Sequence, residues 1–111
     1  GLSSAIDCSR NMAWTMSVEF HPAATEELNA SADWYAERSR IAAQDFLVAF
    51  DLSIASIVSD PTRFAAIDDR HRGCSIKRFP FQIIFRHEND RIVVIAVAHT
   101  KRRPGYWRGR D

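Results

Sequence analysis

The chain has 111 residues, a mass of 12.7 kDa and a formal net charge of +1, which fits a single domain with one modest core. Its composition, 46% hydrophobic and 26% charged, is that of an ordinary soluble globular protein. The longest uninterrupted apolar run, residues 92–98, is too short to cross a membrane. Cys8 and Cys74 make no disulfide framework, so we expect a cytoplasmic protein.

Charge is divided unevenly along the chain. Residues 1–69 carry four basic and eleven acidic side chains, a net charge of −7, whereas residues 70–111 carry eleven basic and three acidic ones, a net charge of +8. Such a division suggests a basic face, for which nucleic acid or an acidic protein segment is a candidate partner. The alternative is a solvated surface without a partner, which is what many charge runs are.

The N-terminal half begins without regular structure and then becomes helical. Residues 1–15 show no clean periodicity, and we interpret them as an extension to one domain that spans residues 16–111. Residues 17–20 fit a short strand. Pro22 then fits the first turn of a helix, where its missing N–H is not needed. From there to residues 37–40, apolar side chains recur at helical spacing: Ala24, Leu28, Ala32 and Tyr35.

A second amphipathic helix is predicted for residues 41–58. The link between the two helices is short, so they should form an antiparallel hairpin. The helix ends at residues 59–61, "SDP", because a residue that precedes proline disfavours the helical conformation. One stripe collects the side chains that we expect to face the core: Ala42, Phe46, Ala49, Phe50, Ser53 and Ile57.

Three strands follow the polar loop at residues 68–73. They are "CSIKRF" (74–79), "FQIIFRHE" (81–88) and "RIVVIAVAH" (91–99), separated by Pro80 and by turn residues. The last strand is apolar throughout its centre, so we expect it inside the sheet and covered on both faces. The order β-α-α-β-β-β with a short C-terminal tail predicts an α+β domain, a two-helix hairpin packed on a small, mostly antiparallel sheet.

Most catalytic chemistries have no support in the residues. His71 and Cys74 form the one pair with a spacing that resembles metal ligands, and a zinc site needs three or four, so we expect no metal. The four glycines form no phosphate-binding loop, and no cofactor is expected. At the start of a predicted strand, Cys74 fits a small core residue better than a nucleophile.

Cations and aromatic residues gather in the last strands and the tail. Alternation places Lys77 and Arg78 on opposite faces of their strand, and it sets Arg86 opposite the apolar residues of its own strand. Cations on a sheet face suit a phosphate backbone, and aromatic rings of the tail can stack on bases. The candidate surface for a target or a nucleic acid therefore comprises Lys77, Arg78, Arg86, Lys101, Arg102, Arg103, Tyr106 and Trp107.

His99 is the candidate group for proton transfer. It shares strand parity with Val93, Ile95 and Val97, and it stands where the last strand leaves the core. A metal-free RNA-cleaving site needs cations on the scissile phosphate and a side chain that moves a proton near neutral pH. The alternatives are structural: His99 can hydrogen-bond the backbone at the strand end, and Trp107 can close the open end of the core.

These segments together resemble the ParE/RelE toxin superfamily of bacterial type II toxin–antitoxin modules. The likeness covers about residues 17–110, and its most specific parts are the "RFPFQIIFR" hairpin and a tail pattern of His-x-x-Arg-x-Pro-x-x-Trp. The tail pattern and the modest pI of 8.1 are closer to the ParE-like, plasmid-stabilisation branch than to the strongly basic ribosome-directed members. Arg103 differs from the acidic residue often found at that position in the branch. The pattern here is His99, Arg102, Pro104 and Trp107.

The resemblance implies a toxin that a cognate antitoxin neutralises by wrapping its surface, in a hetero-oligomer and without a membrane. ParE-like members poison DNA gyrase by binding it, which is our first hypothesis. RelE-like members cleave mRNA on the ribosome without metal, and there His99 and Arg86 would be catalytic, with Lys77 and Arg78 on the phosphates. A third hypothesis is a relative that no longer poisons its host. The helical hairpin and the exposed sheet edge are the expected antitoxin surfaces.

Overall fold

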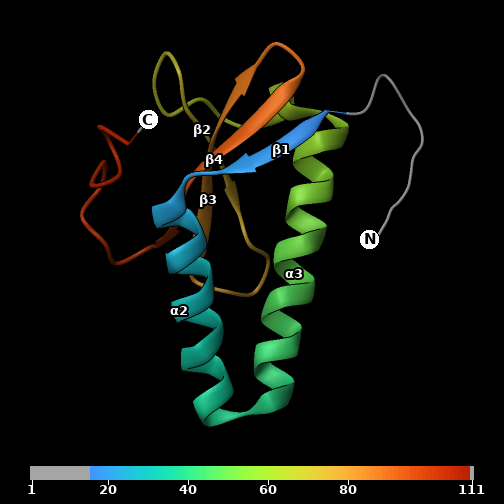
Figure 1. The fold of residues 1–111 in the computed structure, drawn as a ribbon, viewed down its shortest axis with the longest axis vertical. Helices are drawn as coiled ribbons and strands as arrows, with labels where there is room; N and C mark the ends of the chain where they lie inside the picture. Colours follow the sequence, from blue (N-terminus) through green and yellow to red (C-terminus); the bar gives the residue numbers. More distant parts are fainter. Residues whose placement is uncertain (1–15, 111) are drawn as a thin grey trace.

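The computed structural model describes residues 16–110. The predicted order of one strand, two helices and three strands is confirmed, and Figure 1 shows the two helices as a hairpin beside a twisted sheet. The N-terminal extension proposed for residues 1–15 lies outside the described residues. The elements are β1 (Ser17–Phe20), α2 (Pro22–Arg38), α3 (Arg40–Ser59), a 3-10 turn (Pro61–Arg63), β2 (Arg72–Ser75), β3 (Phe81–Glu88) and β4 (Arg91–His99).

Two side-chain caps determine where the helices begin. The Nδ1 atom of His21 accepts a hydrogen bond from the backbone N–H of Ala23 at 3.0 Å, which starts α2. Ser39 serves both helices: its backbone N–H donates to the carbonyl of Tyr35 at 2.8 Å, and its hydroxyl accepts from the N–H of Ala42 at 3.2 Å. One extended residue therefore ends α2, caps α3 and reverses the chain.

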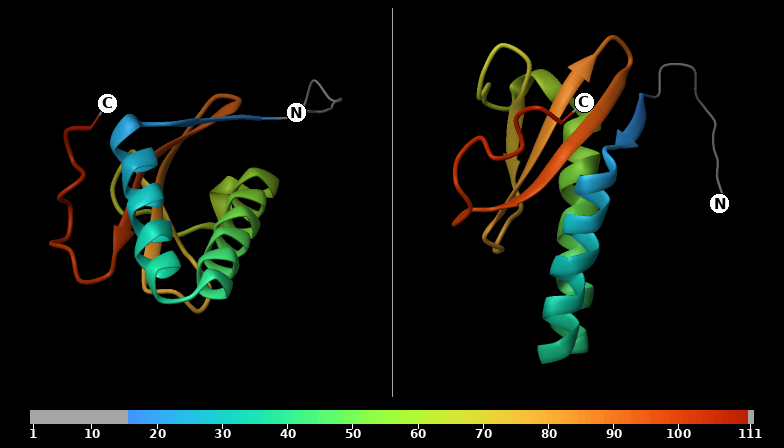
Figure 2. Two further views of the ribbon diagram at one scale, coloured as in Figure 1. Left: turned by 60° about the horizontal axis from the view of Figure 1, so that its bottom comes forward. Right: turned by 60° about the vertical axis from the view of Figure 1, so that its left-hand side comes forward.

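The sheet has the strand order β1-β4-β3-β2. Strand β1 runs parallel to β4, with Ser17 opposite Arg91, and the other neighbours are antiparallel. Strand β4 is thus internal, as its continuous apolar run predicts, and β1 and β2 are the two edges. The turned views in Figure 2 show both helices on one side of the sheet and the C-terminal tail on the other.

A β-bulge in β4 changes which residues face the helices. The register with β3 shifts between Ile84 and Phe85, which leaves Ile95 as the extra residue. Val94 faces the helices before the bulge, and Val97, three positions later, faces them after it. The main core lies between the helices and the sheet, and its large members are Phe46, Phe50, Ile57, Ile83, Phe85, Ile92, Val94 and Val97.

Because of the bulge, the sheet face predicted for His99 is wrong. Alternation puts His99 on the same face as Val93, Ile95 and Val97, whereas the structure keeps it with Val97 alone. Val93 and Ile95 belong to a second cluster on the tail side. His99 lies edge-on to Phe81 of the main core, with ring centroids 5.0 Å apart. An inserted residue turns every later side chain to the opposite face, and this is the cause of the error.

The strand predicted at residues 74–79 lies earlier in the chain. Strand β2 ends at Ser75, and Lys77 and Arg78 lie in the tight turn that leads to β3. Arg78 has a φ of 71°, a left-handed conformation that is foreign to strands. The two cations are consequently exposed turn residues and do not point to opposite faces of a strand.

Helix α3 leaves part of its apolar surface uncovered. By length and composition alone, α3 could cross a membrane, although the uninterrupted apolar runs of the sequence did not indicate this. Core helices of soluble proteins also reach this length and hydropathy. Its Phe46, Phe50 and Ile57 side chains are buried against the sheet. On its outer side, α3 exposes four large apolar side chains: Ile41, Leu47, Val48 and Leu52.

Candidate functional site

One carboxylate of α2 holds the C-terminal tail that follows β4. Glu27 accepts hydrogen bonds from the Tyr106 hydroxyl at 2.7 Å, from two nitrogens of Arg110 at 3.0 Å each, and from the backbone N–H of Val97 at 2.9 Å. Arg110 also donates to the carbonyl of the bulged residue, Ile95, at 3.1 Å. Helix, bulge and tail therefore meet at one side chain. We call this arrangement the Glu27 clasp.

The clasp favours a charged carboxylate. Burial raises the pKa of Glu27, but hydrogen bonds from Arg110, Tyr106 and Val97 lower it, so that the net pKa lies below the ordinary value of 4.5. Burial and the neighbouring carboxylate raise the pKa of Tyr106 to about 12. At neutral pH Glu27 is thus ionised and Tyr106 keeps its proton, which are the states that the hydrogen bonds require.

A second carboxylate holds the tail from the loop before β2. Asp68 lies 2.9 Å from the Nδ1 atom of His71, and it accepts a hydrogen bond from the Nε atom of Arg108 at 3.4 Å. The ring of His71 lies against that of Trp107, with centroids 4.7 Å apart. Hydrogen bonds from the backbone of Arg70 and the side chain of His71 hold the pKa of Asp68 well below its ordinary value. The tail is therefore fastened on both sides.

Trp107 closes the core on the tail side of the sheet. Trp107 is only 4% exposed. Tyr106 packs beside it, and the hydroxyl of Tyr106 donates to Glu27. In this arrangement neither ring is free to stack on a base. The position of Trp107 agrees with the alternative that this residue closes the open end of the core. It covers the apolar side chains on the sheet face opposite the helices: Ile84, Val93, Ile95, Ala96 and Ala98.

The remaining tail cations face solvent. Lys101, Arg102 and Arg103 follow the end of β4 and are exposed. The Arg102 guanidinium lies over the Tyr106 ring, 3.9 Å from its centroid. Within residues 16–110, none of the three forms an ion pair with a carboxylate. Three uncompensated charges make this turn, which we call the basic turn, a candidate contact for an anionic partner.

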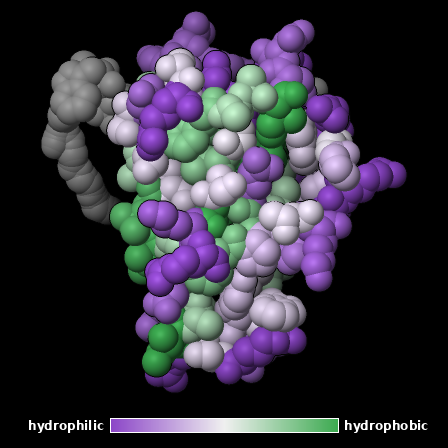
Figure 3. All heavy atoms as spheres, turned by 180° about the vertical axis from the view of Figure 1, so that it is seen from behind, coloured by the Kyte–Doolittle hydropathy of each residue, from purple (hydrophilic) through white to green (hydrophobic). Residues whose placement is uncertain are grey.

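Lys77 and Arg78 line a different surface, a groove of about 480 Å³ between α3 and β2 that we call the α3 groove. Val48 and Leu52 supply apolar wall from α3. Strand β2 is an edge strand, but its start already pairs with the preceding loop: Arg72 bridges Ala66, and the N–H of Gly73 donates to the carbonyl of Ala65 at 3.1 Å, so only the end of β2 is left for another strand. Seen from behind, hydrophobic surface lies on the α3 side next to hydrophilic side chains (Figure 3). Among the described residues the lining includes the carboxylate of Asp45 and three cations: Arg63, Lys77 and Arg78.

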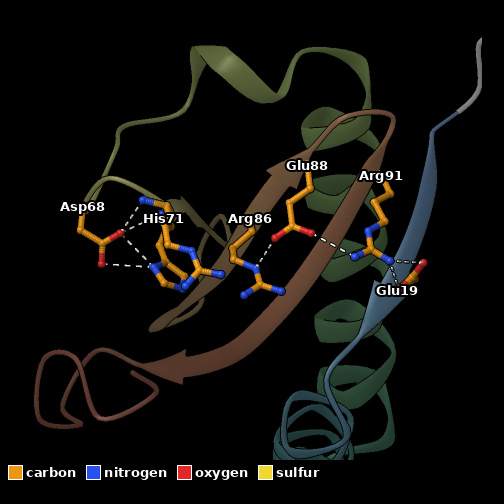
Figure 4. A network of polar contacts seen from close by, with 7 residues as sticks. Glu19, Asp68, His71, Arg86, Glu88 and Arg91 are labelled. Atoms are coloured by element: carbon orange, nitrogen blue, oxygen red, sulfur yellow. Dashed lines mark hydrogen bonds and ion pairs between the residues drawn. The ribbon is translucent and has the colours of Figure 1, made fainter. Parts of the chain in front are cut away.

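Arg86 belongs to neither of these surfaces. It is only 8% exposed, and its Nε atom lies 2.9 Å from a carboxylate oxygen of Glu88. Glu88 pairs in turn with Arg91 at 3.0 Å, and Arg91 pairs with Glu19 of β1 at 3.1 Å. Figure 4 shows this row of alternating charges crossing β3, β4 and β1. Its last link, the exposed pair of Arg91 and Glu19, makes a small addition to the backbone pairing of β1 with β4.

The predicted catalytic residues, His99 and Arg86, lie far apart. In the β3–β4 register His99 is opposite Phe81 and Arg86 is opposite Val93, five positions further along β3. At about 3.3 Å per residue, this places them roughly 16 Å apart along the sheet. Val93 belongs to the tail-side cluster and Phe81 to the main core, so the two side chains also lie on opposite faces. No single phosphate contacts both in this arrangement.

Sequence reasoning missed the residues that hold the tail. Glu27 and Arg110 are 83 positions apart, and nothing local distinguishes Glu27 from the other acidic residues of α2. The ending "YWRGR" could have indicated these contacts. Its two aromatic residues are of types that are often buried, and the cations after them would then need a carboxylate nearby. Trp34 was also missed, although its 52% exposure on α2 makes it a candidate contact residue.

A helical hairpin lies on one face of a four-stranded sheet, and a basic tail is fastened to the other face, which defines a small α+β fold. The structure is similar to a solved structure described as the chromosomal ParDE TA system from P. aeruginosa, with a TM-score of 0.66 at 18% sequence identity over 78% of this chain and 98% of that chain. At this identity the likeness concerns the fold alone.

Family membership comes from the sequence. The profile of the family described as ParE toxin of type II toxin–antitoxin system, parDE, matches residues 18–104. The chain therefore belongs to the ParE toxin family. It is the toxin of a type II toxin–antitoxin module, and the family implies an antitoxin partner. A comparison with curated proteins found no match. The resemblance and the α+β fold expected from the sequence are both confirmed.

Proposed function

We propose that this toxin acts in the cytoplasm and poisons DNA gyrase by binding it, without chemistry of its own. The separation of His99 from Arg86 carries the proposal, because a metal-free nuclease needs a cation and a proton-transfer group at one phosphate. The basic turn supports it as well. Exposed cations without counter-charges are attracted to an anionic target such as a protein that holds DNA.

The α3 groove is the surface that we propose for the antitoxin. It combines exposed apolar side chains of α3 with a basic rim and the end of the edge strand β2. An antitoxin segment that is apolar on one side and acidic on the other fits this surface as a helix in the groove or as a strand added to β2. The toxin and the antitoxin then form a hetero-oligomer.

Inducible expression tests whether the protein is toxic. We expect growth to stop when the toxin is expressed alone and to continue when the neighbouring open reading frame is expressed with it. Normal growth without any antitoxin would contradict the proposal and would favour a relative that no longer poisons its host.

A supercoiling assay with purified protein identifies the target. We expect inhibition of gyrase by the wild type, and by His99→Gln, which keeps a polar side chain but cannot act as a general base. Reversal of the basic turn by Lys101→Glu, Arg102→Glu and Arg103→Glu should abolish inhibition, whereas Arg40→Glu, an exposed change at the start of α3, should not. Ribosome-dependent transcript cleavage that disappears with His99→Gln or Arg86→Ala would instead favour the RelE-like alternative.

A further inference from the structure

A pocket of about 380 Å³ lies where β3 begins and β4 ends, beside α2. Its walls are largely aromatic: Trp34 and Tyr35 come from α2, Phe81 from β3 and His99 from β4. This volume is at the lower end of the range of ligand pockets, so it accommodates one flat ring better than an extended ligand. Neither the antitoxin surface nor the basic turn accounts for it.

Trp34 supplies an ordered aromatic surface that the fold leaves uncovered. It is 52% exposed. The guanidinium of Arg38 lies 3.6 Å from the centroid of its ring, and a nitrogen of the same group donates to the carbonyl of Trp34 at 2.8 Å. Tyr35 meets Trp34 edge-on at 5.1 Å. A large ring held in place by its neighbours but half open to solvent is suited to stacking.

His99 forms the opposite wall and has its ring orientation fixed. The ring is edge-on to Phe81, and its Nδ1 atom accepts a hydrogen bond from the backbone N–H of Lys101 at 3.0 Å. In the neutral ring the proton is therefore on Nε2, which makes that nitrogen a hydrogen-bond donor. The pocket thus has an aromatic surface on one side and an aromatic ring with a polar edge on the other.

Two cations are neighbours of the residues that line this pocket. Lys101, the first cation of the basic turn, is separated from His99 by one threonine. Arg38 follows Trp34 by one helical turn and shares its face of α2. Glu37 lies 3.8 Å from the Arg38 guanidinium, and both side chains are largely exposed, so this ion pair is weak and a phosphate can displace the carboxylate.

We propose that this pocket binds an unpaired base of single-stranded DNA, with the flanking phosphates on Arg38 and Lys101. Proteins that bind single strands combine aromatic stacking surfaces with cations along the backbone, and this pocket has both. A single strand is required because a base reaches the Trp34 ring only when it is not stacked within a duplex. The choice of DNA rests on the proposed function, since gyrase works on DNA.

Fluorescence anisotropy with a labelled single-stranded oligonucleotide of about 12 nucleotides tests this with purified toxin and without gyrase. We expect binding that weakens with salt, with a log–log slope of about −0.7 per phosphate contact. Trp34→Ala should weaken binding by about tenfold, and Arg38→Glu should weaken it as well. A duplex of the same length should bind more weakly than the single strand.

The matched control is Ile41→Ala, another change to an exposed apolar residue, at the start of α3. It should leave DNA binding unchanged, and circular dichroism should show that every variant is folded. Equal binding by folded Trp34→Ala and wild type, equal affinity for the duplex, or tighter binding of RNA of the same sequence would each overturn the proposal. Supercoiling is not measured here, so the gyrase proposal and the DNA proposal can fail separately.

Discussion

Glu27 is the residue on which the position of the tail depends. Its two carboxylate oxygens receive donors from the Arg110 guanidinium, the Tyr106 hydroxyl and the backbone after the bulge. With 17% of its side chain exposed, against 20% for Arg110, the ion pair is largely shielded from water. Such charge-assisted, bidentate hydrogen bonds are stronger than an exposed surface pair. Loss of this one carboxylate should therefore change the position of the basic turn, although Glu27 makes no contact with that turn.

Glu27→Gln should destabilise the protein and loosen the tail. The amide keeps the shape of the side chain but leaves the Arg110 charge without a partner, at an expected cost of about 2 kcal/mol in the free energy of unfolding. Urea denaturation measures that cost, and hydrogen exchange of residues 100–110 reports the tail. Glu26→Gln, an exposed change next door, is the control and should have almost no effect. Equal stability of the two variants would contradict the role of the clasp.

The stability should fall in acid because of the two carboxylates that hold the tail. The folded-state pKa values of Glu27 and Asp68 lie below their ordinary values of 4.5 and 3.8. The stabilisation is therefore complete above about pH 5 and is lost as the pH falls through the folded-state values, since the unfolded chain then binds more protons. Urea midpoints measured from about pH 7 to about pH 3 should show this decline, and Glu27→Gln should have a shallower one. A constant midpoint would refute the prediction.

At the scale of elements, the tail acts as a second cover for the sheet. The helices bury one face through Phe46, Phe50 and Ile57, and the tail buries the other through Trp107. Without the tail, the apolar residues of β3 and β4 on that face would meet water. This explains why an internal strand that is apolar on both sides is followed by a segment rich in aromatic residues and cations.

Truncation of the two described tryptophans should lower stability by very different amounts. Trp107→Ala removes a ring that is 4% exposed and should cost about 3–5 kcal/mol of stability. Trp34→Ala removes one that is 52% exposed and should cost less than about 1 kcal/mol. Thermal or urea melts of both variants give the comparison. Similar losses would show that the tail-side core is not a true core.

Most elements and the buried faces of both helices could be predicted from local signals, whereas the bounds of β2 and the face of β4 after the bulge could not. Prolines, turn residues and apolar periodicity marked the helical hairpin and the internal strand β4. The bulge at Ile95 left no trace, because a run that is apolar at every position reads the same in any register. The face of His99 was therefore predicted wrongly. The Glu27 clasp joins residues 83 positions apart, which no local pattern encodes.

The whole molecule presents two separate basic surfaces. Lys77 and Arg63 border the α3 groove, while the basic turn lies at the end of β4. The uneven charge of the sequence is thus divided further in space, between the surface proposed for the antitoxin and the surface proposed for the target. A bound antitoxin need not cover the basic turn to alter the charge that an approaching target meets.

Association with the antitoxin should depend on salt. Reversing two charges on the rim of the α3 groove, Arg63→Glu and Lys77→Glu, should slow association and reduce its sensitivity to ionic strength. Stopped-flow or surface-binding measurements at about 50 mM and about 500 mM salt test this. Arg40→Glu, an exposed change outside the groove, serves as the control. Unchanged association rates for the double variant would place the antitoxin elsewhere.

Strand β1 is the first described strand to be synthesised, and its partner β4 is the last. Ser17 pairs with Arg91, so β1 cannot pair before residue 91 has been synthesised. Glu27 waits longer still, for Arg110. Contacts between such distant positions form late and slowly, because a long loop must close first. A nascent chain can therefore pair β2 with β3 early, but it adds β1 and sets its tail only after residues 91–110 have been synthesised.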